Sequence, residues 1–240
     1  MGERRLELQL AELVRRPTLA GVGTHVRIFP RAGLSAGRLA YETWLNSIAS
    51  STDVWRQRFI ECPLAHPTWL FRTELMQRFG YRDNGAAEDY DLLLRLLARG
   101  MEFGVVPERL HDWRDHAERA SRRDARYGQD RFTWLKALHL STTVLRGHGE
   151  YVLWGYGATG KALRHDLVLL GHRPAYIVEV HPGRLGQRIH GAPVVEPAEL
   201  RRLRDFPLIV SVAGASARSQ IRAALDQLGF VEADHYVFAA

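Results

Sequence analysis

The stretch YVLWGYGATGKAL, residues 151–163, joins an apolar run to three closely spaced glycines. The run YVLW is typical of a buried strand, and the residues after the last glycine are typical of a helix. Gly155, Gly157 and Gly160 follow the spacing G-x-G-x-x-G. In such a turn the first glycine permits a tight bend, the second lets a ligand approach the backbone, and the third lets the helix pack on the strand. The N-terminus of that helix is suited to a phosphate.

Downstream, strands and helices continue to alternate up to the last residue. Further strands are expected in AYIVEV, PLIVSVA and HYVFAA, and helices in PAELRRLRDF and SARSQIRAALDQLG. Such alternation predicts a parallel sheet covered on both faces. Glu179 ends the second strand, where a ribose-binding acid is expected. We therefore predict a small Rossmann-like domain at residues 150–240.

Two roles stay open for this domain. A lone glycine motif is weak support for NAD(P) or another nucleotide, because the domain has about half the length of a full dinucleotide fold and no Tyr-x-x-x-Lys dyad follows. The stretch IVEVHPGRLGQRIHGAPVVEPAEL, residues 177–200, resembles small Rossmann-like domains appended to sugar-modifying enzymes and to some methyltransferases. That resemblance implies either a structural appendage or one that binds a nucleotide sugar.

The segment RGHGE, residues 146–150, separates this domain from a first α/β domain at residues 1–146. Pro17 ends an expected amphipathic helix, a strand is expected from Val22 to Phe29, and Gly80 ends a strand-helix pair. Two short strands are expected around Pro107. Further helices are expected in GRLAYETWLNSIAS, after EDYD up to Gly100, and in RYGQDRFTWLKALHLSTTVL.

The overall composition excludes several classes. The chain has 240 residues and a net charge of +6, from 33 basic and 27 acidic residues. It contains no block of five like charges, so we expect no nucleic-acid partner. No apolar run approaches the ~20 residues that span a bilayer, so no transmembrane segment is expected. The first residues lack the apolar core of a signal peptide, and one cysteine allows no internal disulfide, so we expect a cytoplasmic protein.

Three acids, Glu88, Asp89 and Asp91, stand at the start of the leucine-rich segment EDYDLLLRL. Acids in a first helical turn complement the helix dipole, and each such interaction stabilises the helix by about 0.3–1 kcal/mol. The alternative is a catalytic role, because a carboxylate at a helix start beside a cleft can remove a proton from a hydroxyl group. On that view the helix dipole keeps the carboxylate ionised at neutral pH.

The stretches ECPLAHPTWLFRTELMQRFGYRDNGAAEDYDLLLRL and VPERLHDWRDHAERASRRDARYG resemble the C-terminal half of family 2 glycosyltransferases of the GT-A fold. The resemblance covers residues 3–140. It implies transfer of a sugar from a nucleotide-diphosphate donor to the hydroxyl of a carbohydrate or lipid-linked acceptor. It also implies that Asp89 is the catalytic base and that Glu88 shapes the acceptor site.

The same resemblance implies further binding residues. His116 is the candidate ligand of a divalent metal, Mg²⁺ or Mn²⁺, and His66 is expected near the acceptor cleft. Arg114, Arg119 and Ser121 are the expected partners of the donor diphosphate, since guanidinium groups pair well with phosphate oxygens. A solvated basic loop and a structural histidine are the alternatives at these positions.

The sequence departs from the family in one respect. The family places a nucleotide-binding half with an Asp-x-Asp metal motif before a segment like RRLELQLAELVRRP, and this sequence begins at that point. A misplaced start, a separate partner chain and a decayed remnant each account for this. A second copy or a partner chain is then expected to cover the open sheet edge. On this view the transferase is truncated and inactive alone. The alternatives to a transferase are a nucleotide-dependent oxidoreductase and a non-catalytic nucleotide-binding or scaffold protein.

Overall fold

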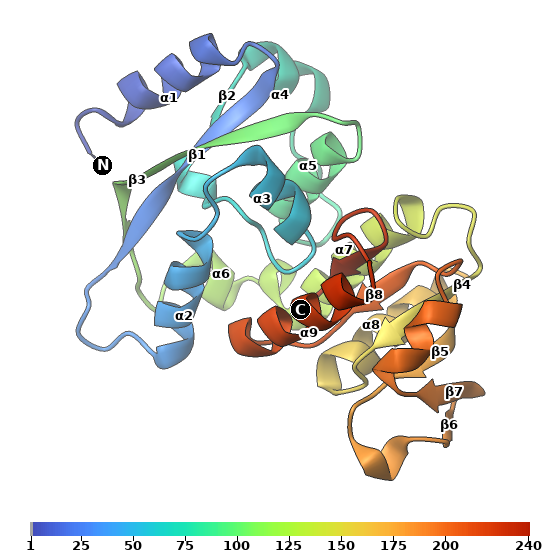
Figure 1. Ribbon diagram of the computed structural model, residues 1–240. Helices are drawn as coiled ribbons and strands as arrows, with labels where there is room; N and C mark the ends of the chain where they lie inside the picture. Colours follow the sequence, from blue (N-terminus) through green and yellow to red (C-terminus); the bar gives the residue numbers. More distant parts are fainter. Residues whose placement is uncertain (1) are drawn as a thin grey trace. The chain divides into compact units, whose positions relative to one another are not determined.

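The computed structural model describes residues 2–240, with the backbone alone at Ala120, and has an α/β fold made of two compact units (Figure 1). One unit contains the chain up to Arg58 together with Cys62–Gly128, and the other contains Phe59–Glu61 and Gln129–Ala240. Helix α7 (Gln129–Thr142) therefore belongs to the second unit, and the boundary expected at residues 146–150 falls inside that unit. Side chains of α7 such as Leu135 and Leu140 are buried.

The sheet of the first unit has three strands in the order β2-β1-β3. The central strand β1 (Leu19–Phe29) pairs antiparallel with the short β2 (Leu70–Phe71) and parallel with β3 (Glu102–Arg114). Alternate β1 side chains such as Val22, Val26 and Ile28 are buried, which is the pattern expected of a central strand.

Strand β3 corrects one expectation. A single strand of 13 residues runs through Pro107, where the sequence predicted two short strands. Proline lacks an N–H group, so a sheet tolerates it only at an edge or a bulge. Both conditions hold here, because β3 pairs only with β1 and its register shifts where Thr24, His25 and Val26 pair with it.

The helices of the first unit follow most of the sequence expectations. Helix α1 ends before Pro17, and its buried Gln9 donates to the carbonyl oxygens of Val22 and Thr68, both at 2.7 Å. Helix α4 ends at Gly80 with a positive φ of 44°. The helical segments of this unit are α1 (Arg5–Arg15), α2 (Ala36–Leu45), α3 (Ser51–Gln57), η1 (His66–Thr68), α4 (Thr73–Phe79), α5 (Glu88–Leu97), α6 (Ala120–Arg123) and η2 (Ala125–Tyr127).

Helix α5 is more deeply buried than one apolar face requires. Every residue from Tyr90 to Leu97 is buried, including the charged Asp91 and Arg95. These two side chains form an ion pair of 2.7 Å, and Arg95 also donates to the carbonyl oxygens of Phe79 and Gly80. A buried charge is stable only when it is paired and hydrogen-bonded in this way. Asp91 is therefore a structural residue of the core.

The second unit contains a six-stranded sheet in the order β6-β7-β5-β4-β8-β9. All its pairings are parallel except that of β6 with β7. The strands are β4 (Glu150–Trp154), β5 (Arg173–Val178), β6 (Arg188–Ile189), β7 (Ala192–Val195), β8 (Leu208–Val210) and β9 (Tyr236–Phe238). The chain runs from β4 outward to β5 and β7 on one side, and then to β8 and β9 on the other. The predicted Rossmann-like parallel sheet is confirmed.

Two features of this unit were not expected from the sequence. The β6–β7 hairpin turns at His190 and Gly191, which both have positive φ. The segment PAELRR forms a 3-10 helix, η4 (Pro197–Arg202), where a regular α-helix was expected. Another short 3-10 helix, η3 (Pro182–Arg184), follows β5.

Helices α8 (Ala158–Leu169) and α9 (Ala215–Gln227) complete the layers of the second unit (Figure 1). Helix α8 links β4 to β5, and α9 links β8 to β9, in opposite directions along the sheet. Right-handed crossovers in opposite directions place the two helices on opposite faces. Side chains of α9, among them Ile221 and Leu225, pack on the sheet face that carries Val152, Trp154 and Val210.

Candidate functional site

A cavity of about 930 Å³ opens at the carboxyl ends of β4, β5 and β8. It is lined by Trp154 at the end of β4, Glu179 just after β5, and Ser211 just after β8. The chain direction reverses beside β4, because β5 lies on one side of it and β8 on the other. Ligands of open α/β sheets bind in the crevice at such a switch point.

The three motif glycines have different surroundings. A Cβ added to Gly160 would lie 2.3 Å from the carbonyl oxygen of Gly155 and 2.6 Å from Ser211 Oγ. A Cβ on Gly155, which has φ +93°, would lie 2.5 Å from Val212. A Cβ on Gly157 would meet nothing within 4 Å. The first and third glycines are thus required by packing, while the second leaves the backbone open toward the cavity that it lines.

The N-terminus of α8 lies at this cavity. Gly157 is its N-cap residue, and no side chain caps the helix, while Gly157, Ala158 and Thr159 all line the cavity. The first N–H groups of a helix have no partner within the helix and carry a partial positive charge. The turn therefore offers backbone donors to an anionic group.

Glu179 already has partners at the rim of the cavity. Its Oε1 accepts hydrogen bonds from the Tyr156 N–H at 2.9 Å and from Arg184 Nη1 at 3.0 Å. Arg184 also donates to the carbonyl oxygen of Tyr156 at 3.3 Å. The guanidinium thus links the acidic residue to the glycine-rich turn. Arg184 was not predicted from the sequence, because no motif spacing connects a residue of this loop with Glu179.

The opposite wall of the cavity is mostly apolar. One face of α9 contributes Ala217, Ile221 and Ala224, and Val212 and Pro197 lie beside it. Gln220 on the same helix supplies an amide. A flat ring that is apolar on its faces and polar at its edge matches such a wall.

In the first unit, Asp89 lies at the start of α5 beside His66. Its Oδ2 is 3.6 Å from His66 Nδ1, and its Oδ1 accepts the Tyr90 N–H at 2.7 Å. The Asp89 side chain is 16% exposed. Burial raises the pKa of Asp89, and the charge of His66 and the Tyr90 N–H oppose that rise. The sequence predicted that the helix dipole keeps Asp89 ionised at neutral pH; in the structure, burial is the largest influence on the pKa of Asp89 and acts in the opposite direction.

Two tyrosines that the sequence analysis did not single out complete this region. The Tyr81 hydroxyl is 2.8 Å from His66 Nε2, and the Tyr127 hydroxyl lies 2.8 Å from both carboxylate oxygens of Glu88. Desolvation, with Asp89 and Glu88 nearby, raises the pKa of Tyr81. Desolvation and the hydrogen bond to Glu88 raise the pKa of Tyr127. The quoted stretch GYRD contains Tyr81, but only the fold brings its hydroxyl to His66.

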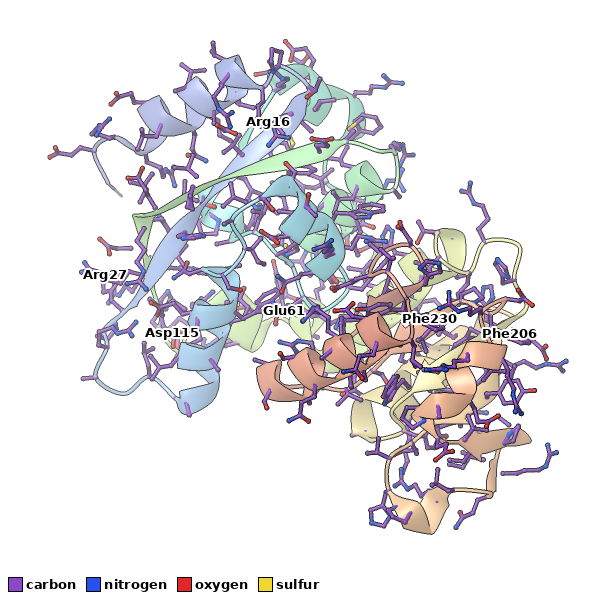
Figure 2. All side chains as sticks on the ribbon, viewed as in Figure 1. Arg16, Arg27, Glu61, Asp115, Phe206 and Phe230 are labelled. Carbon is purple, nitrogen blue, oxygen red and sulfur yellow. The ribbon has the colours of Figure 1, made fainter. Side chains whose placement is uncertain are left out.

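The residues expected at the donor diphosphate lie at the end of β3 and in the segment after it. Arg119 Nη1 pairs with Asp115 Oδ1 at 3.0 Å, and its guanidinium lies 4.5 Å from the ring of Trp113. Asp115, which is labelled in Figure 2, also pairs with Arg122 at 2.6 Å. Burial disfavours its charge, but the Arg119 hydrogen bond and the arginine charges hold the pKa of Asp115 below its usual range. Arg119 thus belongs to a local ion-pair network, while the remaining predicted residues, Arg114, His116 and Ser121, are exposed.

Residues 2–240 contain no three-residue ligand set for the metal that the sequence predicted. No group of three His, Cys, Asp or Glu side chains in this range is arranged to hold a metal ion. Mg²⁺ and Mn²⁺ prefer several oxygen ligands, and an exposed His116 does not supply them. The described residues therefore show no three-ligand set that includes His116. In the same range no helix has both the length and the apolar character needed to cross a bilayer.

No protein-family model matches the sequence, and no curated protein matches it. A solved structure of RSP in complex with β-NAD⁺ and operator DNA is similar at 14% identity and a TM-score of 0.30, over 43% of this chain and 57% of that chain. RSP in complex with β-NADH is similar at 15% identity and the same TM-score, over 43% and 60%. This chain spans less than two thirds of those chains, and a likeness this weak carries no argument about function.

Proposed function

We propose that the second unit binds a nucleotide in the cavity at the carboxyl ends of β4, β5 and β8. The phosphates lie against the open backbone of Gly157 and the first N–H groups of α8. The ribose hydroxyls bond to Glu179, and the base lies along the apolar face of α9. One observation carries the proposal: of the three motif glycines, only Gly157 has free space at its Cβ position, and that space adjoins the cavity.

Calorimetric titration of the full chain tests this proposal. The panel contains NAD⁺, NADH, NADP⁺, UDP, a UDP-sugar and ATP, so it also separates an oxidoreductase cofactor from a nucleotide sugar. Binding of at least one of these ligands is expected. If no nucleotide binds, the cavity has another role and the proposal is wrong.

Gly157→Val gives the first specific prediction. The added side chain fills the space where the phosphates approach, so affinity for the bound nucleotide falls by about tenfold or more, which corresponds to ~1.4 kcal/mol. Gly149→Val is the matched control, because a Cβ there also meets nothing within 4 Å and the residue does not line this cavity. If the two variants bind the nucleotide equally well, the phosphates do not lie at the glycine-rich turn.

A second candidate function rests on the first unit. We propose that Asp89 takes up the proton of an acceptor hydroxyl during sugar transfer from a nucleotide-diphosphate sugar. A partly exposed carboxyl whose pKa is raised by burial, and which lies beside an imidazole, supports this role.

Asp89→Asn is the corresponding prediction. The amide cannot accept a proton, so consumption of nucleotide sugar in the presence of carbohydrate or lipid-linked acceptors falls by about a hundredfold or more. Asp83→Asn is the control, because Asp83 is exposed in the preceding loop. Circular dichroism and urea unfolding check that both variants fold. Wild-type turnover by Asp89→Asn would exclude this carboxylate as the proton acceptor.

A further inference from the structure

Three side chains from separate segments of the first unit form a continuous polar chain. Asp89 is the second residue of α5, His66 begins η1, and Tyr81 lies in the loop between α4 and α5. The Asp89 Oδ2–His66 Nδ1 distance is 3.6 Å, and the His66 Nε2–Tyr81 hydroxyl distance is 2.8 Å. The imidazole is thus placed between an acid and a phenol, with one ring nitrogen facing each.

The partners set the direction of the hydrogens. An ionised carboxylate only accepts hydrogen bonds, so the hydrogen between Asp89 and His66 belongs to Nδ1. In a neutral imidazole the other nitrogen, Nε2, then carries a lone pair and accepts the Tyr81 O–H. The 3.6 Å separation is longer than a hydrogen bond and closes by about 0.7 Å when one forms. Such shortening is common when a substrate completes a site.

Exposure increases outward along this chain. The Asp89 side chain is 16% exposed and that of His66 is 36% exposed, while Tyr81 is 47% exposed. An acceptor hydroxyl arriving from solvent therefore reaches the Tyr81 oxygen before it reaches the carboxylate. The largely enclosed Asp89 is the inner end of the chain.

Neighbouring groups hold the chain in place. The ring of His66 makes edge contacts with Trp69 at 4.9 Å and with Tyr81 at 5.6 Å between centroids. Among the charged neighbours, Glu88 is bonded to Tyr127, and Arg126 on η2 pairs with Asp124 at 2.6 Å. Glu88 therefore does not compete with Asp89 for the imidazole.

We propose that Tyr81, His66 and Asp89 form a proton relay in which Tyr81 is the residue that contacts the acceptor hydroxyl. This inference rests on the proposed transfer function and specifies the route of its proton. Tyr81 is then the catalytic residue, and His66 and Asp89 act through it.

The acceptor proton moves to the Tyr81 oxygen, the phenolic hydrogen moves to His66 Nε2, and the Nδ1 hydrogen moves to Asp89 Oδ2. The acceptor oxygen uses the freed electron pair to bond to the anomeric carbon of the nucleotide sugar. The bond from that carbon to the diphosphate breaks, and the diphosphate leaves with its electron pair. The relay ends with a protonated Asp89, a neutral His66 whose hydrogen has moved from Nδ1 to Nε2, and a Tyr81 whose hydroxyl carries the proton of the acceptor.

The first test is ¹⁵N NMR of the His66 ring in the full chain, at a pH where the imidazole is neutral. A protonated Nδ1 and an unprotonated Nε2 are expected. Tyr81→Phe removes the hydrogen bond to Nε2 and shifts that resonance, whereas Tyr127→Phe, which removes a hydroxyl from Glu88, leaves it in place. If Nε2 is the protonated nitrogen, or if the Nε2 resonance does not shift in Tyr81→Phe, the relay is wrong.

The second test is the transfer assay with nucleotide sugars. Tyr81→Phe and His66→Asn each lower kcat by about a hundredfold or more while KM for the nucleotide sugar stays within about twofold. Tyr176→Phe in the second unit is the matched control and keeps the wild-type rate. If wild-type protein transfers no sugar, the proposed function itself fails. If wild-type protein is active and Tyr81→Phe is equally active, the function stands and the relay is wrong.

Discussion

At the residue scale, the three acids at the start of α5 have three different partners. Asp91 is buried against Arg95, Glu88 is bonded to Tyr127, and Asp89 faces His66. Sequence position alone treats them as equivalent contributors to the helix dipole. Their chemistry differs because the helix turns each carboxylate toward a different part of the unit, so one carboxylate is a core ion pair and another is available to accept a proton.

Lys136 is a second residue whose surroundings decide its behaviour. Its Nζ donates to the carbonyl oxygens of Ile60 at 2.6 Å and of Ala239 at 3.1 Å, all within the second unit. Although the side chain as a whole is partly exposed, desolvation of the ammonium group lowers the pKa of Lys136 to about 8. Glu61 opposes this shift and Arg218 adds to it.

A pH dependence of stability follows from Lys136. The folded protein releases this proton at about pH 8, whereas an unfolded chain holds it up to the ordinary value of 10.5. The unfolded state binds more protons between these values, so the free energy of unfolding rises with pH in that window. The gain in the free energy of unfolding from deprotonation of Lys136 is complete above pH 10.5 and is lost as pH falls toward 8. It amounts to about 1–3 kcal/mol.

Urea unfolding of wild type and Lys136→Met between pH 7.5 and 10.5 measures this contribution. As pH rises, the free energy of unfolding of wild type is expected to increase relative to that of Lys136→Met. Parallel curves over the whole range would show that the ammonium group is as well solvated in the folded protein as in the unfolded chain.

At the element scale, the decisive contact is that of α8 with the end of β4. Gly160 in the first turn of α8 touches the backbone of Gly155, and Ser211 Oγ donates to the Gly155 carbonyl oxygen at 2.7 Å. Three elements, β4, α8 and the segment after β8, therefore meet without room for another atom. The cavity wall depends on this close approach.

Gly160→Ala tests that contact. The new methyl group would lie 2.3 Å from a carbonyl oxygen that cannot move without displacing the strand. The strain outweighs the better helix propensity of alanine and lowers the free energy of unfolding by about 1–3 kcal/mol. Urea unfolding measures it, with Gly149→Ala as the control in open space. Identical midpoints for both variants would show that α8 is not pressed against β4.

At the scale of the whole molecule, the sequence predicts what depends on local pattern. The glycine motif and the strand-helix alternation sufficed for the parallel sheet. The membership of α7 could not be predicted, because it depends on which buried face finds a partner in space. The same holds for Arg184 and Tyr81, whose roles arise from loops that meet only after folding. The acidic helix start was visible in the sequence, but its imidazole partner was joined to it only by the fold.

Strand β3, finally, limits how this protein meets other chains. It forms one edge of the first sheet, and near its midpoint Pro107 has no N–H group to donate to an added strand. Three residues on, the Leu110 carbonyl oxygen is already taken by the Gly2 N–H at 2.7 Å. The neighbouring Glu108 and Arg109 are exposed and charged. A strand from another chain therefore cannot pair along the full length of this edge. Natural sheets use such interruptions to prevent edge-to-edge aggregation.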